Sequence, residues 1–352
     1  MTQAWVSRSP ACLARAPPAA LPLETKVAFL RAAANYPEST DRVDAVETRM
    51  SWVFLLDQFV YKLKKPVCCE LLDFRTLAAR HYFCEEELRL NRRLAPNIYL
   101  GVVPLTLHGG HLALDGGGKV LDWLVRMRRV PGECMLLHRL KHGSLKDADL
   151  ARVAARLAAF HATLAPQAFS CAQYRARFAR RIGATVRELG RIVDAGSARR
   201  LEALREAQLA ALRRHGDLLD ERVHAGHVVD GHGDLRPEHV YLGEPPGAID
   251  CLEFSRALRV ADVADELGFL ALECERLGAP AVGQALLHLY GVASGDRVPP
   301  ILLHFYQSCR AATRALIAAR HLEAGQRCGA QHWLHSTGDY LRLAEEHVAR
   351  GA

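Results

Sequence analysis

The chain has 352 residues, half of them apolar and 24% charged, which is typical of a globular protein with a sizeable core. The net charge is +7, but the basic residues are scattered and no basic patch carries interleaved aromatic residues, so we expect no nucleic-acid partner. No apolar run is long enough to cross a bilayer, so we expect no membrane association either.

The ten cysteines form no CxxC pair and are spread through segments that are typical of helices and strands. This usage favours reduced, mostly buried thiols in a cytoplasmic protein over a disulfide framework. Residues 1–22 are rich in Ala and Pro and lack the apolar core of a signal peptide, so we expect a disordered tail there.

The first elements predicted after the tail form a small sheet with one long helix. Residues 23–37 have the pattern of a short amphipathic helix that ends at a proline. Two β-branched and aromatic runs, 52–56 and 59–65, predict a hairpin, and 74–94 predicts a helix. Further strands are predicted within 98–114 and 121–130, with glycine-rich turns.

The character of the sequence changes after residues 131–133, because long segments then follow a helical period. One loop-and-strand segment, 232–254, interrupts them. We therefore predict an α+β fold with two lobes: a small β-rich lobe at 23–131 and a larger helical lobe at 132–352. No internal repeat is visible.

The interrupting segment begins "HGDLRPEHVYL" and continues into "GAIDCLEF", which together predict a short hairpin. Corresponding ends of two paired strands lie close in space, so we expect Asp234, His239 and Asp250 to meet at one edge. Phosphoryl transfer from a magnesium nucleotide requires one acid that accepts a proton and two ligands for the metal.

A phosphoryl-transfer site also needs a cation for the phosphates, held by a buried acid. In the second strand of the predicted hairpin, Val60 and Lys62 share one face, where Val60 covers an adenine and Lys62 reaches the phosphates. Lys64 shares that face and is the alternative. A buried lysine needs a partner, and we choose Glu87 on the following helix over the acids at 85 and 86.

The chain resembles the aminoglycoside-phosphotransferase branch of the protein-kinase-like superfamily. More narrowly, it is similar to bacterial members of unassigned substrate, some of which carry a C-terminal P-loop kinase domain. The matching stretches are "ETRMSWVFLLDQFVYKLKKPV", "FCEEELRLNRRLAPNIYLGVV", "HGDLRPEHVYL", "AIDCLEFSRALRVADVADELGFLALE" and "FYQSCRAATRAL". They run in the family's order from about residue 23 to the end, and no GxxxxGK(S/T) motif occurs.

The resemblance implies a bilobal protein-kinase-like fold and an ATP-dependent phosphotransferase that acts on a hydroxyl of a small molecule. It implies that Asp234 is the catalytic base, that Asp250 is the principal Mg²⁺ ligand, and that Lys62 contacts the phosphates while paired with Glu87.

The resemblance also implies supporting roles. Met127, Arg128 and Arg129 would lie near the interlobe hinge that contacts the adenine edge, and Asp265 would brace the catalytic loop from beneath. We further expect His232 to support that loop through backbone hydrogen bonds.

Two departures from the family pattern stand out. The family pattern H-G-D-x-x-x-x-N has His239 in the asparagine position here. Because Mg²⁺ prefers oxygen ligands, His239 is either a poor Mg²⁺ ligand, a ligand that favours Mn²⁺, or a partner of Asp234, and Glu253 is a candidate replacement ligand. The phosphate loop "ETRMS" has no glycine, so Ser51 and backbone N–H groups must bind the phosphates.

Two other functions stay open at this point. The histidine in the asparagine position favours a kinase-like module that binds a nucleotide with little turnover. The run "HAGHVVDGHGDLRPEH" contains His224, His227, His232 and His239 and allows a metal hydrolase, although the spacing matches no mechanism-bearing zinc motif.

The acceptor is not identified by the sequence. Arg310 and Arg314 lie one helical turn apart with Tyr306 on the same face, and we expect them to line a pocket for an anionic or hydroxyl-rich acceptor. A polycationic aminoglycoside would favour a pocket rich in carboxylates instead. The sequence predicts no oligomeric state and no particular partner kinase.

Overall fold

The computed structural model describes residues 21–69, 72–193, 197–323 and 330–351. The chain divides into two compact units, the first being Met1–His138 with His239–Ala257 and the second Arg139–Glu238 with Leu258–Ala352. Most of the expected tail, at 1–20, lies outside the described residues, as do Cys12 and Cys328. Segment 239–257, which we had expected in the helical lobe, groups with the β-rich first unit.

The first unit is built on one antiparallel sheet of six strands, in the order β1-β2-β3-β8-β6-β7. These strands are β1 Asp44–Glu47, β2 Ser51–Leu55, β3 Phe59–Lys64, β6 Tyr99–His108, β7 His111–Leu114 and β8 Lys119–Arg128. The predicted hairpin is confirmed as β2 and β3. We did not predict β1, whose four residues include two acids that disfavour strands. Among the described strands it pairs with β2 alone, at the edge of the sheet.

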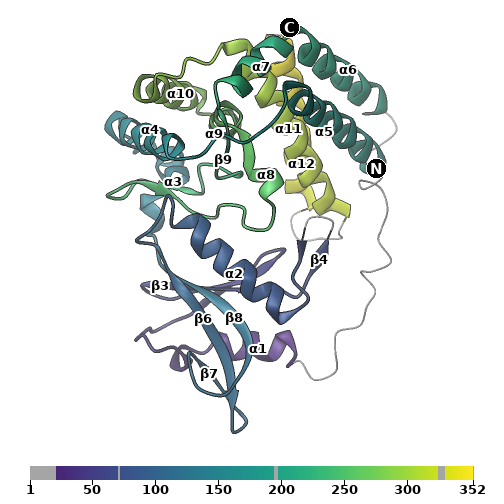
Figure 1. Cartoon of the computed structure of the whole chain (residues 1–352). Helices are drawn as coiled ribbons and strands as arrows, with labels where there is room; N and C mark the ends of the chain where they lie inside the picture. The colour runs from purple at the N-terminus through teal and green to yellow at the C-terminus, as the bar shows by residue number, and fades with distance from the viewer. Residues whose placement is uncertain (1–20, 70–71, 194–196, 324–329, 352) are drawn as a thin grey trace. The chain divides into compact units, whose positions relative to one another are not determined.

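Helices α1 and α2 contribute to two different apolar clusters, and alternate side chains of β3 point into one or the other. Helix α1, Leu23–Leu30, packs with Tyr61 and Leu63 of β3 in one apolar cluster. Helix α2, Leu77–Asn91, contributes to a second cluster that contains Val60 of β3. Because side chains alternate along a strand, Lys62 and Lys64 share the face of Val60, where α2 lies across β6 and β8 (Figure 1).

Short elements complete the first unit. The predicted second hairpin is present, although each strand has only two residues: β10, Val240–Tyr241, pairs antiparallel with β11, Gly247–Ala248. A second short pair joins β4, Cys68–Cys69, to β5, Leu72–Asp73. Two 3₁₀ turns lie at Ala33–Asn35 and Gly132–Cys134.

Helices make up most of the remaining chain. They are α3 Leu136–Lys141, α4 Asp147–Ala162, α5 Cys171–Ile192, α6 Ala198–Arg214, α7 Gly216–His224, α8 Arg256–Arg259, α9 Val263–Arg276, α10 Pro280–Ser294, α11 Pro300–Glu323 and α12 Ala330–Arg350. The main core of the second unit forms where α5, α6, α9, α11 and α12 bring aromatic and aliphatic side chains together. One two-stranded pair, β9 Val228–Asp230 with β12 Val260–Asp262, lies among them.

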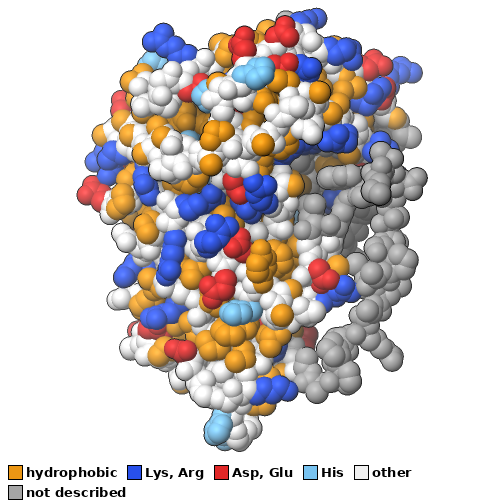
Figure 2. All heavy atoms as spheres, in the orientation of Figure 1, with side chains coloured by type: hydrophobic (Ala, Val, Ile, Leu, Met, Phe, Trp, Pro, Cys, Tyr) orange, Lys and Arg blue, Asp and Glu red, His pale blue; other side chains and the backbone are white. Residues whose placement is uncertain are grey.

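Charged side chains are scattered over the surface as expected, whereas only half of the described cysteines are buried. Figure 2 shows basic and acidic groups interspersed over the face in view, with no continuous basic block there. The eight described cysteines form no disulfide with one another, and Cys84, Cys251, Cys274 and Cys309 are buried. Within the described residues, no helix combines the length and apolar character required to cross a membrane. A cytoplasmic location stays a prediction.

Candidate active site

Lys62 and Glu87 are brought together between β3 and α2. The Nζ atom of Lys62 lies 2.9 Å from Oε1 of Glu87, whose side chain is fully buried. Glu87 lies on the buried face of α2 with Cys84, Leu88 and Asn91, a spacing that follows the helical turn. The helix phase therefore selects Glu87 rather than the acids at 85 and 86.

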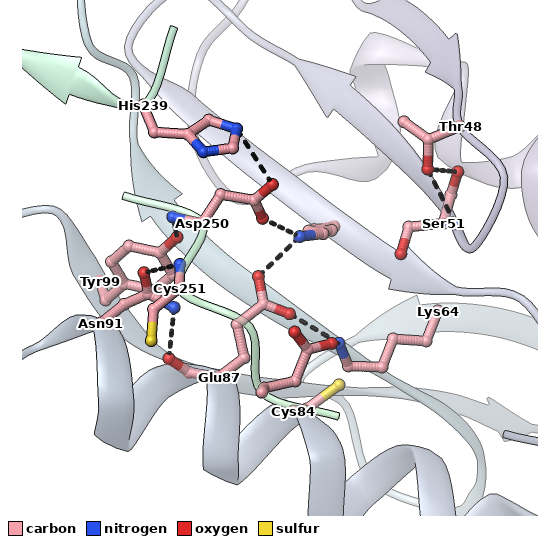
Figure 3. A network of polar contacts seen from close by, with 12 residues as sticks. Thr48, Ser51, Lys64, Cys84, Glu87, Asn91, Tyr99, His239, Asp250 and Cys251 are labelled. Carbon is pink, nitrogen blue, oxygen red and sulfur yellow. Dashed lines mark hydrogen bonds and ion pairs between the residues drawn. The ribbon is translucent and has the colours of Figure 1, made fainter. Parts of the chain in front are cut away.

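Lys64 shares the same acid, so the second lysine is a component of the site and not a replacement for the first. Its Nζ lies 2.6 Å from Oε2 of Glu87 and also contacts Glu253, and its side chain is fully buried (Figure 3). One carboxylate thus binds two ammonium groups, one through each oxygen. Sequence reasoning had treated the two lysines as alternatives.

Asp250 completes this cluster from the loop after β11. One oxygen, Oδ1, lies 2.7 Å from Nζ of Lys62, and the side chain is 48% exposed. The backbone of Asp250 has a positive φ of 62°, which is uncommon for a residue other than glycine and is best tolerated by Asp and Asn. Its N–H donates to the Tyr99 hydroxyl, and the N–H of Cys251 donates to Asn91 (Figure 3).

The buried charges control each other's protonation. Burial opposes ionisation of Glu87, but the two lysines outweigh it and hold the pKa of Glu87 below its ordinary value. Burial also raises the pKa of Glu253, and the neighbouring Glu87 carboxylate adds to that increase. Glu253 is therefore the member of this group that most readily retains a proton.

Of the three predicted Mg²⁺ ligands, Asp250, His239 and Glu253, Asp250 suits a magnesium ion best. The second oxygen of Asp250 lies 3.6 Å from Nε2 of His239, so imidazole and carboxylate face each other. Glu253 is only 8% exposed and is bound to Lys64, which removes it from the ligand set as it stands. No three His, Cys, Asp or Glu side chains among the described residues form a group able to hold a metal. Mg²⁺ commonly takes one or two carboxylates and completes its shell with phosphate oxygens and water.

The glycine-free loop is the turn between β1 and β2, and a threonine closes it. The N–H and the hydroxyl of Thr48 both donate to the carbonyl of Ser51, at 2.8 and 2.9 Å, and the N–H of Ser51 donates back to the Thr48 hydroxyl at 3.0 Å (Figure 3). Ser51 is buried, whereas Thr48 and Arg49 are exposed at the tip. Sequence reasoning named Ser51 and overlooked these two.

The predicted adenine-facing residues divide into an apolar pair and a structural arginine. Met127 lies directly opposite Val60 in the β3–β8 register, and both belong to the apolar cluster beneath α2. Arg129 donates from its side chain to the carbonyl of Leu56 at 2.6 Å. Arg128 donates its backbone N–H to Ile98. Arg129 therefore links the residues that follow β8 to those that follow β2.

The loop that carries Asp234 belongs to the second unit and is held by Glu266. One oxygen of Glu266 accepts the N–H groups of His232 and Gly233, at 2.7 and 2.6 Å. Gly233 has a φ of 86°, and this left-handed conformation lets successive N–H groups converge on one anion. The other oxygen of Glu266 lies 3.0 Å from Nε2 of the buried His161.

The brace that we had assigned to Asp265 is indirect. Asp265 accepts from Nε of Arg310 at 2.8 Å, and Arg310 in turn donates to the carbonyl of Gly233 at 3.3 Å. The acid that contacts the loop itself is the next residue, Glu266. Both acids lie in the first turn of α9, so their different partners follow from the helix phase.

Asp234 has an arginine partner that sequence reasoning missed. Nε and a terminal nitrogen of Arg236 lie 3.2 and 3.1 Å from Oδ2 of Asp234, and the other terminal nitrogen lies 2.6 Å from Glu238. The N–H of Asp234 donates to Nδ1 of the buried His232 at 3.3 Å. The only available signal was the position of Arg236, two residues after the acid.

The four histidines of the alternative metal site have four different partners. His224 lies 3.4 Å from the sulfur of Cys171, and His227 lies 3.6 Å from Asp296. His232 contacts the N–H of Asp234, and His239, in the first unit, faces Asp250. These separate contacts do not support a shared histidine centre.

Of the three residues proposed for the acceptor, Arg310 and Arg314 both interact with the charge of Asp234, whereas Tyr306 has a different partner. Tyr306 is fully buried and donates to Asp262 at 2.8 Å, so the structure removes it from the proposed pocket. Arg310 is engaged by Asp265 and Gly233. Arg314 lies over the ring of Tyr340 at 5.7 Å, so it contacts the α12 core.

No protein-family model matches the chain. Uncharacterized proteins of Mycobacterium tuberculosis and Mycobacterium bovis are 33% identical over 293 residues, which cover 81% of this chain and 56% of each relative. The chain thus spans little more than half the length of these relatives.

Solved structures share the fold at low sequence identity. A choline/ethanolamine kinase family protein from Mesorhizobium loti matches with a TM-score of 0.54 and 15% identity over 92% of this chain and 98% of its own. Choline kinase from Streptococcus pneumoniae matches with a TM-score of 0.53 and 14% identity over 88% and 94%. The GDP complex of an aminoglycoside 2'-phosphotransferase has a TM-score of 0.50 and 14% identity over 94% and 99%. The chain has the fold of these kinases. The predicted α+β kinase-like fold is therefore confirmed.

The buried brace of the catalytic loop predicts a specific acid sensitivity. Burial opposes ionisation of Glu266, but the hydrogen bond from His161, the nearby histidine charges and the Gly233 N–H outweigh it and lower its pKa from 4.5 to about 2. Because the folded-state pKa is depressed, this stabilisation is present above about pH 4.5 and is lost as the pH falls toward 2.

We expect Glu266→Gln to lose about 3 kcal/mol of unfolding free energy near neutral pH and progressively less toward pH 2. Urea unfolding of both proteins at a series of pH values measures this difference. A difference that stays constant from pH 6 to pH 2.5 would show that ionisation of Glu266 does not stabilise the fold.

Proposed function

We propose that this chain transfers the γ-phosphate of ATP to a hydroxyl group of a small-molecule acceptor. The observation that carries the proposal is the Lys62 ammonium group, which contacts both the buried Glu87 and the half-exposed Asp250. The printed names of the matched structures, which are choline kinase and aminoglycoside phosphotransferase, support it. We further propose that the chain belongs to the aminoglycoside-phosphotransferase branch of the protein-kinase-like superfamily.

The residues of the first unit would bind the nucleotide. Val60 and Met127 offer an apolar surface for the adenine, and the β1–β2 turn offers Thr48, Arg49 and backbone N–H groups to the phosphates. Lys62 would contact the α- and β-phosphates while Glu87 fixes its position. In the absence of nucleotide, Lys62 contacts the carboxylate of Asp250. When nucleotide binds, a metal ion would take the place of Lys62 at Asp250, and Lys62 would contact the phosphates instead.

A divalent cation, Mg²⁺ or alternatively Mn²⁺, would be held by Asp250 with His239 beside it, and it would neutralise the phosphate charge. The softer imidazole ligand favours Mn²⁺ more than an asparagine would. Glu253 would remain beside Lys64, which it already contacts.

The residues of the second unit would act on the acceptor. The acceptor oxygen forms a bond to the γ-phosphorus while the bond from that phosphorus to the β-bridging oxygen breaks, so ADP leaves. Asp234 takes the hydroxyl proton, and Arg236, bound to the same carboxylate, keeps it oriented. Glu266 and Arg310 fix the loop backbone through Gly233 and His232.

Nucleotide binding and turnover test the proposal. The full chain is incubated with ATP, Mg²⁺ or Mn²⁺ and a library of hydroxylated metabolites, and ADP formation and acceptor phosphorylation are measured. We expect acceptor-dependent ADP formation. Stabilisation by nucleotide without turnover under either metal would instead identify a nucleotide-binding module, which the contact between His239 and Asp250 makes the second candidate.

Asp250→Asn should remove the metal-dependent part of nucleotide binding. At nucleotide concentrations near 100 times Kd, the wild-type protein gains about 2.7 kcal/mol of stability, and we expect the variant to lose most of the increment that Mg²⁺ adds. Thermal melting with ATP, with and without metal, measures this increment.

Asp73→Asn is the matched control, because Asp73 lies in the same unit and its side chain is also 48% exposed. It should respond to metal like the wild type. An equal metal effect in the Asp250 variant would remove Asp250 from the metal site.

A further inference from the structure

The loop after β11 is held through two neighbouring backbone N–H groups. The N–H of Asp250 donates to the hydroxyl of Tyr99, the first residue of β6, over 3.1 Å. The N–H of Cys251 donates to Oδ1 of Asn91, the last residue of α2, over 2.9 Å (Figure 3). Tyr99 and Asn91 are only 2% and 1% exposed, whereas the Asp250 side chain is 48% exposed. Buried groups therefore fix the backbone of this loop and leave its carboxylate accessible.

Asn91 uses both ends of its side-chain amide. Its Nδ2 donates to the carbonyl of Glu87, one turn earlier in α2, over 2.9 Å. A carbonyl can only accept and the N–H of Cys251 can only donate, so one orientation of the amide satisfies both. The carboxylate of Glu87 binds Lys62. Asn91 therefore links the acid that fixes Lys62 to the backbone that carries Asp250.

The backbone conformation of Asp250 needs this support. Its φ of 62° lies in the left-handed region, which costs free energy for a residue other than glycine. Such a conformation persists where the surrounding contacts determine it, and the two neighbouring N–H bonds are contacts of this kind. If either bond were lost, we expect the backbone to relax and the carboxylate to move away from Nζ of Lys62, which it contacts at 2.7 Å.

The residues before Asp250 leave little room for the loop to shift as a whole. A Cβ atom on Gly247, in β11, would lie 2.3 Å from the carbonyl oxygen of Leu94, closer than real Cβ atoms come to their neighbours. The backbone of β11 is therefore packed directly against the residues that follow α2. Ile249 donates its N–H to the carbonyl of His239, which holds the residue just before Asp250. Relaxation would thus be concentrated in Asp250 and the residues after it.

We propose that Asn91 and Tyr99 are positioning residues for the metal ligand Asp250. Asn91 has a second role, because it keeps Asp250 in a fixed position relative to the Lys62–Glu87 pair. Neither positioning side chain would touch the metal or the nucleotide. The inference rests on the proposed function, since that function makes Asp250 the metal ligand and Lys62 the phosphate contact. Reacting sites are sensitive to position, because a displacement of about 1 Å can cost about a hundredfold in rate.

Amide hydrogen exchange in the full chain, without metal or nucleotide, measures the positioning directly. Asn91→Leu removes the amide at similar side-chain volume, and Tyr99→Phe removes only the hydroxyl. We expect exchange of the Cys251 N–H to become about tenfold faster in the first variant, because that N–H loses its hydrogen bond. For the same reason, the Asp250 N–H should exchange about tenfold faster in the second variant. NMR spectra of the two variants and the wild type give these rates.

Thermal melting with ATP, with and without Mg²⁺, gives the second readout. We expect the increment that Mg²⁺ adds to fall by about half or more in both variants, although every proposed metal and phosphate ligand is still present. Tyr36→Phe is the matched control, because it removes another buried hydroxyl of the first unit, one that donates to the carbonyl of Leu30. It should match the wild type in both measurements.

Each variant is judged on its own, so one residue can be confirmed and the other rejected. Unchanged exchange overturns the inference for that residue. Faster exchange with a full Mg²⁺ increment also overturns it, because the side chain would then support the loop without positioning a metal ligand. An equal loss in the Tyr36 variant would attribute the effect to general destabilisation. A wild-type chain that gains nothing from Mg²⁺ would instead contradict the proposed function, and the inference would be wrong as well.

Discussion

Asp234→Asn is expected to reduce acceptor phosphorylation by about a thousandfold, because an amide cannot accept the hydroxyl proton during transfer. Asparagine keeps the size of the side chain and an oxygen for Arg236, which now lies 3.1 Å from the carboxylate. The loop itself is held through backbone groups by Glu266, so the fold should survive. The rate of ADP formation at saturating acceptor, together with the melting temperature, measures the effect.

Asp230→Asn is the matched control for this experiment. Asp230 lies four residues earlier, is 21% exposed against 19% for Asp234, and is also paired with an arginine, Arg259. It is expected to change the rate by no more than a few fold. If the Asp234 variant were folded and transferred phosphate at the wild-type rate, another group would have to take the proton.

Glu87→Gln is expected to destabilise the first unit by about 3–5 kcal/mol, because it leaves two lysines with less counter-charge in a buried position. Lys64 is fully buried and Lys62 nearly so, and Glu87 bonds to both. Nucleotide affinity should fall as well, since Lys62 loses the contact that fixes it. Chemical unfolding and ATP titration measure the two effects.

Glu85→Gln serves as the control on the same helix. Its side chain is 53% exposed and lies 3.6 Å from His81, so we expect a change within about 0.5 kcal/mol. Equal stability of the two variants would show that the lysine cluster does not depend on Glu87.

The pairing of Lys62 with Glu87 could be predicted from the two-residue repeat of a strand and the 3.6-residue repeat of a helix. Alternation along β3 places Lys62 and Val60 on one face, and the helical turn of α2 places Glu87 with its apolar neighbours. Both elements are long enough for their periods to be visible in the sequence. The same reasoning placed Lys64 correctly on that face but could not show that a single acid binds both lysines.

The support of the catalytic loop could not be anticipated to the same degree. Asp265 and Glu266 are adjacent acids in the first turn of α9, and only the phase of the helix against the loop decides which one meets the His232 and Gly233 N–H groups. Contacts between segments far apart in the sequence, such as His161 with Glu266, leave no local pattern.

The grouping of residues 239–257 with the sheet has a consequence for dissecting this protein into fragments. The chain passes between the two units three times, after residues 138, 238 and 257. A gene fragment that stops at residue 138 would encode every strand of the six-stranded sheet but neither Asp250 nor Glu253, leaving Lys62 and Lys64 with one carboxylate between them. Deletion from either end therefore cannot yield an autonomous nucleotide-binding half.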